Sequence, residues 1–174
     1  RVLSVVDTKG AGEDYCAMPV AAKWRGSDKW FIVDFLCDNS APKTVNQKLA
    51  MCIERNGVQQ ARFESNAAGG KVADDVSDML KERGVLCSVQ KKYTGSNKET
   101  RILASSQWVL ENCVFRDPSL YEPGSDYSIA MGQMTSYVLD GKNRHDDAPD
   151  AMSMLADMLS RSQRAKAKAI RRPF

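Results

Sequence analysis

The chain has 174 residues, which is enough for one domain with a hydrophobic core. Apolar residues make up 43% of it and charged residues 27%, a composition that excludes a disordered chain. The net charge is only +3. No apolar run approaches the roughly 20 residues that cross a bilayer, so no membrane partner is expected.

The first part of the chain predicts an antiparallel meander. Residues 2–7, 15–24 and 29–37 are apolar or mixed runs that are typical of strands. Two turns, rich in glycine and in polar residues, separate them at 9–14 and 25–28.

Helices and strands alternate after the meander. A helix begins at Ser40-Ala41-Pro42 and ends near Asn56-Gly57, with apolar residues at helical spacing between them. We expect further strands at 60–64 and 85–90 and further helices at 69–83, 98–110, 126–139 and 148–161.

This order of elements predicts an α/β fold, with a mixed β-sheet flanked by α-helices. It resembles the ribonuclease H-like arrangement, in which the ends of the first and fourth strands lie side by side and face the start of the last helix. We expect one domain of this kind over residues 1–160, followed by a basic C-terminal tail over 161–174.

The charges are unevenly distributed. Residues 161–174 contain six basic residues and no acid, and a second basic stretch covers 91–101. Three aspartates, in contrast, stand within the five positions 146–150. Separate acidic and basic clusters favour a polyanion that is held near a metal ion. By itself, the stretch 161–174 is better explained as a solvated chain end.

Acidic residues stand where strands end and where the last helix begins. Asp7 follows the first strand, Glu64 closes the strand at 60–64, and Asp146, Asp147 and Asp150 open the last helix. Converging carboxylates are what two-metal phosphodiester hydrolysis needs, because ions about 3.5–4 Å apart clamp the attacking and leaving oxygens. We predict that Asp7 bridges two Mg²⁺ ions and that Glu64 binds one of them. Asp147 and Asp150, three positions apart on one helix face, would bind the other.

Each of these acids also has an ordinary structural explanation. One aspartate of the last motif can cap the helix, with Pro149 in its first turn. Asp7 can be a turn residue, and Glu64 can be a strand-end acid beside solvent. Only the joint placement of the acids favours a metal site.

Several polar and basic residues are candidates for substrate contacts. His145 can contact the scissile phosphate or tune a water molecule, although a lone histidine is more often a surface residue. Lys91 and Lys92, with Lys98 and Arg101 on a predicted helix, can hold DNA phosphates without reading bases. A solvated helix face explains Lys98 and Arg101 equally well. Asn66, before a Gly-Gly pair, allows a backbone turn close to a substrate.

The cysteines and tryptophans are expected in the core. The five cysteines have no C-x-x-C spacing and the chain has one histidine, which excludes an ordinary zinc site. We interpret the cysteines as reduced thiols of a cytoplasmic protein. Trp24, Trp30 and Trp108 occupy inward-facing positions of predicted strands and helices.

Together these motifs resemble the C-terminal nuclease domain of the large terminase subunit of tailed bacteriophages. The likeness spans nearly the whole chain and rests on four segments: Asp7 with the turn up to Asp14, Phe63-Glu64-Ser65-Asn66, residues 98–102 and residues 145–151. The resemblance implies a ribonuclease H-like domain that uses Mg²⁺ or Mn²⁺ and cuts concatemeric double-stranded DNA. It also implies that Asp7, Glu64 and an acid of the last motif are catalytic, and we favour Asp147 and Asp150 for that third position.

The resemblance further implies partners and a location. The family's full protein carries an N-terminal ATPase domain, and the start of this chain almost inside a strand is expected of a fragment without that domain. A small terminase subunit and a portal protein are the other expected partners, in the host cell cytoplasm.

Two alternatives stay open. One is another ribonuclease H-like nuclease, such as a Holliday-junction resolvase or a transposase core. The other is a binding module that grips DNA or docks on a portal, in which the acids merely cap the helix and contact solvent. Loss of plasmid nicking in folded Asp7→Ala and Glu64→Ala proteins would separate the nuclease from the binding module.

Overall fold

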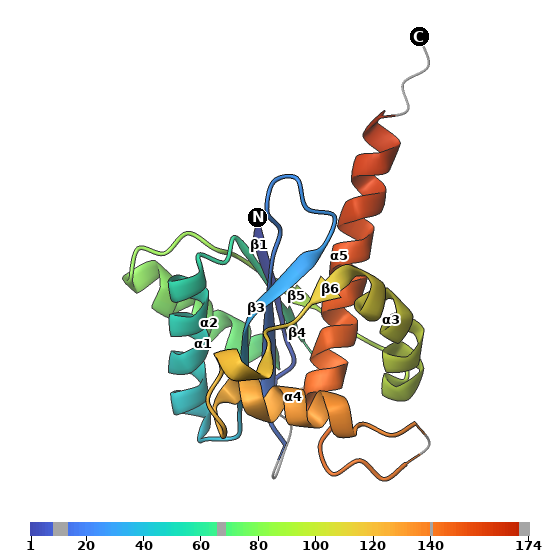
Figure 1. Ribbon diagram of the computed structural model, residues 1–174. Helices are drawn as coiled ribbons and strands as arrows, with labels where there is room; N and C mark the ends of the chain where they lie inside the picture. The colour runs from blue at the N-terminus through green and yellow to red at the C-terminus, as the bar shows by residue number, and fades with distance from the viewer. Residues whose placement is uncertain (9–13, 66–68, 140, 171–174) are drawn as a thin grey trace.

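A mixed six-stranded sheet forms the centre of the protein, in the order β5-β4-β1-β2-β3-β6 (Figure 1). The structure is a computed structural model that describes residues 1–8, 14–65, 69–139 and 141–170. The strands are β1 (Val2–Val6), β2 (Cys16–Ala22), β3 (Trp30–Asp38), β4 (Gln60–Glu64), β5 (Ser88–Lys92) and β6 (Cys113–Val114).

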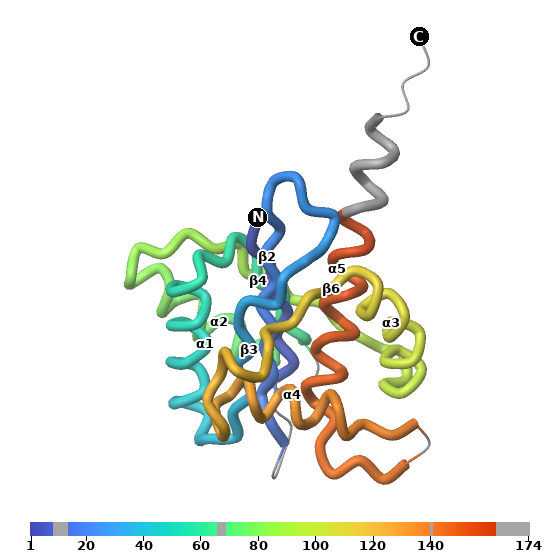
Figure 2. Tube along the Cα trace, viewed as in Figure 1, coloured from blue at the N-terminus to red at the C-terminus, as the bar shows by residue number. Residues whose placement is uncertain are grey.

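Helices cover both faces of the sheet (Figures 1 and 2). They are α1 (Pro42–Asn56), α2 (Gly69–Glu82), α3 (Lys98–Asn112), α4 (Asp126–Ser136) and α5 (Asp147–Ile170), with a 3₁₀ helix at Pro118–Leu120. One apolar cluster joins α1 and α2 to one face, and a second joins α4 and α5 to the other. Helix α3 packs on α5 at the outside of the second layer. The predicted α/β fold, a mixed sheet flanked by helices, is confirmed.

The strand pairing brings the ends of β1 and β4 together. Strands β1, β2 and β3 form the predicted antiparallel meander, and β4 pairs with β1 in parallel, with Val5 opposite Arg62 and Val6 opposite Phe63. Strand β1 is buried on both faces, as expected of a central strand between two helical layers. Because parallel neighbours end at the same edge of the sheet, the acids that follow or close these strands are neighbours.

Several element boundaries differ from the predicted ones. Strand β5 begins at Ser88 instead of residue 85, because the N–H of Val85 bonds back to the carbonyl of Leu80 and closes the end of α2. Helix α4 ends at Ser136 because the backbone of Val138 pairs with the side chain of Asn143 and turns the chain.

The end of α5, the strand β6 and the position of Trp24 also differ from the prediction. Helix α5 continues to Ile170, beyond the predicted end at 161, and the short strand β6 beside β3 was not predicted. Trp30 is buried as expected, but Trp24 is 57% exposed and stacks on Phe31 at the surface, so its assignment to the core was wrong. Within the described residues, no helix has the length and apolar character needed to span a membrane.

Candidate active site

Asp7 lies at the end of the central strand and is held rigidly there. Its N–H donates to the carbonyl of Ala17 at 2.9 Å, and its own carbonyl accepts from the N–H of Ala17 at 3.0 Å. The residue is only 6% exposed. A buried carboxylate on a fixed backbone is suited to a ligand that must not move.

Glu64 stands beside Asp7 at the end of β4, and its charge raises the pKa of Asp7. The chain then enters α2 through Gly69, where any Cβ atom would overlap the backbone carbonyl of Glu64 and the hydroxyl of Thr8. The glycine therefore allows α2 to start directly against the end of β4. The Gly-Gly pair singled out in the sequence has this packing role at Gly69, whereas Asn66 lies outside the described residues.

The first turn of α5 supplies the remaining acids. Asp147 and Asp150 are buried, at 7% and 3% exposed, and the N–H of Asp150 bonds to the carbonyl of Asp146 at 3.1 Å. Pro149 fits this turn because it lacks only an N–H that would have no helical partner there. The N–H of Ala148 instead finds the side-chain oxygen of Gln133 on α4, at 2.9 Å.

The contact between Gln133 and Ala148 leads to a stability prediction. We expect Gln133→Leu to lower the free energy of unfolding by about 1–3 kcal/mol, because a buried N–H at the start of α5 loses its acceptor. Urea unfolding measures this. Gln107→Leu, on the exposed side of α3, is the control and should change stability by less than about 0.5 kcal/mol. Equal effects of the two changes would contradict the assigned role of Gln133.

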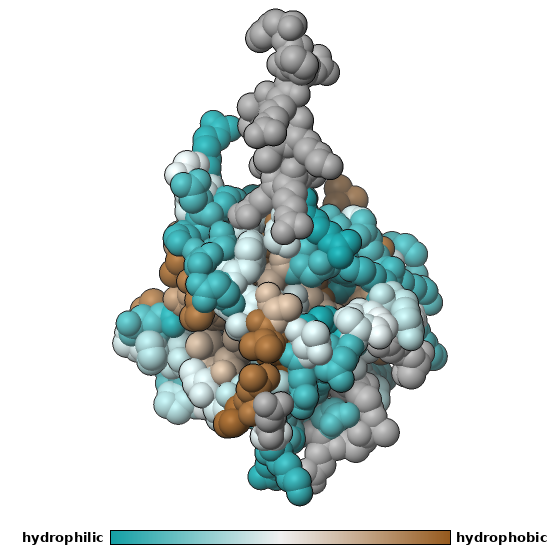
Figure 3. Space-filling view, turned by 90° about the vertical axis from the view of Figure 1, so that its right-hand side faces the viewer, coloured by the Kyte–Doolittle hydropathy of each residue, from teal (hydrophilic) through white to brown (hydrophobic). Residues whose placement is uncertain are grey.

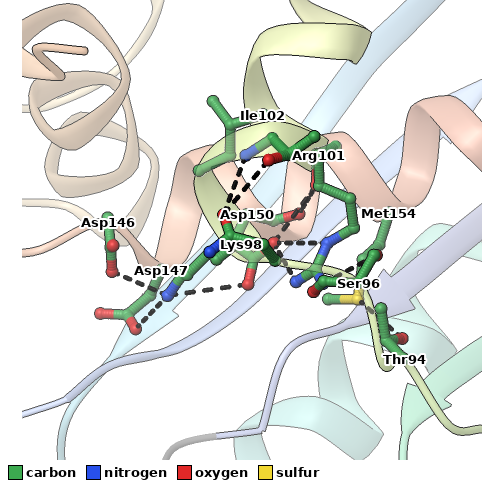
Figure 4. Close-up of polar contacts among 12 residues, drawn as sticks. Thr94, Ser96, Lys98, Arg101, Ile102, Asp146, Asp147, Asp150 and Met154 are labelled. Carbon is green, nitrogen blue, oxygen red and sulfur yellow. Dashed lines mark hydrogen bonds and ion pairs between the residues drawn. The ribbon is translucent and has the colours of Figure 1, made fainter. Parts of the chain in front are cut away.

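Two cations of α3 lie among the acids of α5 (Figure 4). The Lys98 ammonium is 2.7 Å from Asp146, 3.7 Å from Asp147 and 3.6 Å from Asp150. The Arg101 guanidinium donates to one oxygen of Asp150 through two nitrogens, at 2.5 and 3.1 Å. These contacts offset the repulsion among carboxylates that the folding of α5 against the sheet brings together.

The electrostatics of the site follow from burial and from these neighbours. Burial raises the pKa of Asp7 well above its ordinary value, and the charges of Asp150 and Glu64 raise it further against the opposing effect of Lys98. Burial also raises the pKa of Asp147, although the N–H of Tyr15 and the charge of Lys98 act in the other direction. Burial opposes the charge of Lys98, but its hydrogen bond to Asp146 and the nearby carboxylates outweigh this and raise its pKa.

The structure distinguishes the two aspartates that were favoured as metal ligands. Asp150 lies close enough to Asp7 to act on its charge directly, together with Glu64. Asp147 points instead toward Tyr15, just before β2, and accepts a hydrogen bond from its N–H at 3.1 Å. The nearby charge of Asp14 contributes to the raised pKa of Asp147. Of the predicted site residues, Glu64 and Asp150 therefore act on the charge of Asp7, whereas Asp147 is held by the N–H of Tyr15.

The predicted auxiliary and basic residues fall into different places. His145 packs edge-on against the ring of Tyr15, with centroids 5.0 Å apart, and so borders Asp147. Lys91 and Lys92 project from opposite faces of β5: Lys91 pairs with Asp74 on α2, and Lys92 with Asp157 on α5. Only Lys92 thus lies on the α5 side of the sheet with Lys98 and Arg101.

Three charged residues beside this site were not predicted as site residues, namely Arg62, Asp157 and Arg161. Each carries a periodic signal that could have revealed it. Arg62 is two residues before Glu64, so strand alternation places both on one face. Asp157 and Arg161 follow Asp150 by seven and eleven residues, which places all three on one face of a helix.

The residues present fit a divalent cation by their chemistry. In the described part of the chain, no three His, Cys, Asp or Glu side chains are grouped as a preformed metal site. The donors that do converge are carboxylates, the ligands that Mg²⁺ and Mn²⁺ prefer, and an ammonium group already lies among them as a positive charge.

Comparisons with known proteins agree with this architecture. The fowlpox virus Holliday junction resolvase has 14% sequence identity to the chain and a TM-score of 0.57, covering 92% of this chain and 99% of that one. The fowlpox virus resolvase in complex with substrate Holliday junction DNA has 13% identity and a TM-score of 0.54, covering 91% and 99%. At such identities the likeness is one of fold. None of the curated proteins compared with the chain matches it.

A family match is more specific. The family described as "Terminase Bacteriophage T7, Ribonuclease H-like domain" matches residues 6–113, well over half of the chain. The matched region contains Asp7, Glu64, Lys98 and Arg101. The chain therefore belongs to the family of the ribonuclease H-like domain of the bacteriophage T7 terminase.

Proposed function

We propose that this chain is the metal-dependent endonuclease domain of a terminase large subunit and that it cuts concatemeric double-stranded DNA. The observation that carries the proposal is the buried Asp7 at the edge of the sheet, close enough to Glu64 and Asp150 for both charges to raise its pKa. These side chains come from three distant parts of the chain, and helix capping does not account for acids at the ends of two strands. The family match gives the proposal its biological context.

The proposed roles of the residues follow from their placement. Asp7, fixed by two backbone hydrogen bonds, is suited to be the shared ligand of two Mg²⁺ or Mn²⁺ ions, with Glu64 and Asp150 completing the site and Asp147 beside them. When bound, such ions stabilise the charge that develops on a phosphate and lower the pKa of an attacking water. Lys98 and Arg101 contact Asp150 and would add positive charge close to a substrate phosphate bound there.

The substrate and partners belong to the same proposal. Hydrophilic side chains cover much of the face on which α3 and α5 lie, with a narrow apolar strip that runs downward from its centre (Figure 3). Lys92, Lys98 and Arg101 lie on this side of the sheet and would contact DNA phosphates, whereas Lys91, on the other side, would contact DNA only beyond the sheet edge. An N-terminal ATPase domain, a small terminase subunit and a portal protein are the proposed partners, in the host cell cytoplasm.

Nicking of supercoiled plasmid tests this function. We expect the protein to nick plasmid in Mn²⁺ or Mg²⁺ but not in EDTA, and we expect Glu64→Gln to lower the rate about 10²-fold, through loss of one metal ligand. Glu54→Gln is the control. Glu54 lies on α1, on the far side of the sheet, where it pairs with Arg83 at the surface.

The same assay separates the alternatives. Equal nicking by the Glu64→Gln and Glu54→Gln proteins would remove the catalytic assignment. Binding of DNA without cleavage in any metal would favour a binding module. Cleavage of a four-way junction in strong preference to linear duplex would favour a resolvase, the activity named for the structurally similar fowlpox virus protein.

A further inference from the structure

A cavity of about 160 Å³ opens beside the acidic site, between β4, β5 and α5. This is far more than the roughly 10–15 Å³ that one water molecule needs. Six of its eleven lining residues are charged, and Val5, Phe63 and Met154 form its apolar wall. Glu64 and Arg101 line it as well, so the cavity and the acidic site are continuous.

Positive charge is in excess in this cavity. Lys92 and Arg161 contact Asp157 at 3.0 and 2.7 Å, whereas the nearest nitrogen of Arg62 is 3.9 Å away from it, beyond hydrogen-bond length. Three cations therefore share one carboxylate. The Arg62 side chain is also only 19% exposed, so water screens it poorly from the other two cations. A second anion in the cavity would offset this repulsion.

An anion bound in this cavity would lie next to Glu64 and Asp150, because the basic and acidic residues share one face of α5 and one face of β4. Along α5, Asp150, Met154, Asp157 and Arg161 follow one another at spacings of four, three and four residues, so they form one stripe on the helix. Along β4, Arg62 and Glu64 share a face and stand about 7 Å apart. The surface thus changes from acidic to basic over roughly two residues of strand.

We infer that the cavity formed by Arg62, Lys92, Asp157 and Arg161 binds a phosphodiester group of DNA, next to the phosphate at the acidic site. The guanidinium groups of Arg62 and Arg161 supply planar, always-charged donors that match phosphate oxygens. Asp157 holds Lys92 and Arg161 in place while leaving net positive charge for the phosphate. That this phosphate neighbours the one that is cut rests on the proposed function. That the cavity binds a DNA phosphate does not.

Salt-dependent DNA binding tests the inference. Fluorescence anisotropy of a labelled duplex, measured in EDTA to prevent cleavage, gives the affinity at several salt concentrations. We expect Arg62→Gln to weaken binding about tenfold for any sequence and to lower the slope of log K against log salt by about 0.9, the value for one lost phosphate contact. Arg161→Gln should behave alike. Because Arg161 is 68% exposed, we expect that change to leave the fold intact.

Arg83→Gln is the matched control, since Arg83 pairs with Glu54 on the far layer of helices. It should leave both the affinity and the slope unchanged. Unchanged values in both cavity variants would overturn the phosphate site, even if the protein nicks plasmid. If the cavity variants lower the affinity and the slope but the unmodified protein never cleaves DNA, the phosphate site stands and only the proposed nuclease function is rejected. Binding of inorganic phosphate that depends on Arg62, with DNA affinity unaffected, would also overturn it.

A DNA duplex with one uncharged backbone linkage tests where along the DNA the Arg62 contact lies. A duplex with one methylphosphonate, which lacks the phosphate charge, should be cut more slowly by the unmodified protein when the substitution lies next to the cut. Arg62→Gln should be insensitive to the same substitution. Equal slowing of both proteins would place the phosphate contact elsewhere.

Discussion

Replacing Asp7 with asparagine is expected to abolish DNA cleavage and, at neutral pH, to raise the stability of the metal-free protein. Cleavage should fall about 10³-fold or more, because the loss of a shared metal ligand removes several kcal/mol of transition-state stabilisation. The free energy of unfolding should rise by about 0.5–2 kcal/mol, the usual range for a stabilising single change. Burial and the charges of Asp150 and Glu64 disfavour the ionised carboxylate of Asp7, and a neutral amide removes both effects.

The pH dependence of this gain has a definite sign. The pKa of Asp7 is raised in the folded state, so between the ordinary value of 3.8 and the raised value the folded protein binds more protons than the unfolded chain. The stability of the unmodified protein relative to Asp7→Asn should therefore fall as the pH rises through this window. Well below pH 3.8 the carboxyl group is neutral in both states, and the pH-dependent part of this difference should vanish.

Urea unfolding at several pH values, with and without Mn²⁺, measures both effects. Mn²⁺ should stabilise the unmodified protein and should have little effect on Asp7→Asn, because a bound ion stabilises only the state that holds it. Asp28→Asn, in the exposed turn before β3, is the control and should resemble the unmodified protein. An Asp7→Asn protein that is less stable at every pH would contradict the account of a repulsive site.

Replacing Lys98 with glutamine should have the opposite effect on stability. Lys98 lies among Asp146, Asp147 and Asp150, and its loss leaves their charges uncompensated. Removing one partner of a fully buried ion pair costs about 3–5 kcal/mol, but a third of the Lys98 side chain is exposed, so we expect a loss of about 1–3 kcal/mol. Added Mn²⁺ should recover much of it, because a divalent ion restores positive charge at the same carboxylates.

The matched control is Lys81→Gln, since Lys81 forms an exposed pair with Asp78 on α2 and should contribute no measurable stability. Unfolding in urea, with a titration of Mn²⁺ for each protein, makes the comparison. Identical stabilities of the Lys98→Gln and Lys81→Gln proteins without metal would show that the acids of α5 tolerate each other without this cation.

Most of the architecture could be predicted from local patterns. The apolar runs before Asp7 and Glu64, the helical spacing of Met152, Leu155 and Leu159, and the turn residues between strands each depend on neighbours in the sequence. Burial confirms these helix positions, and the predicted meander is present. Boundaries were predicted less well where a distant contact ends an element, as Asn143 does for the chain after α4.

The site was predicted in its residue types but not in its geometry. Acidic clustering indicated a bound cation, and that interpretation could be made from charge repulsion alone. The separate orientations of Asp147 and Asp150 depend on Tyr15, which precedes β2, and on Lys98 and Arg101 of α3. Helical spacing alone treats the two aspartates as equivalent, and for that reason it could not rank them.

The sequence by itself determined the kind of fold, the acids that a metal site needs and the family to which the chain belongs, because these depend on periodicity and residue type. Only the tertiary structure decided that Lys92 pairs with Asp157 on α5 while Lys91 pairs with Asp74 on α2, and that Arg62 and Arg161 meet at Asp157. The physical reason is that electrostatic energy depends on distance in space. Strand pairing and helix packing set that distance between residues that are far apart along the chain.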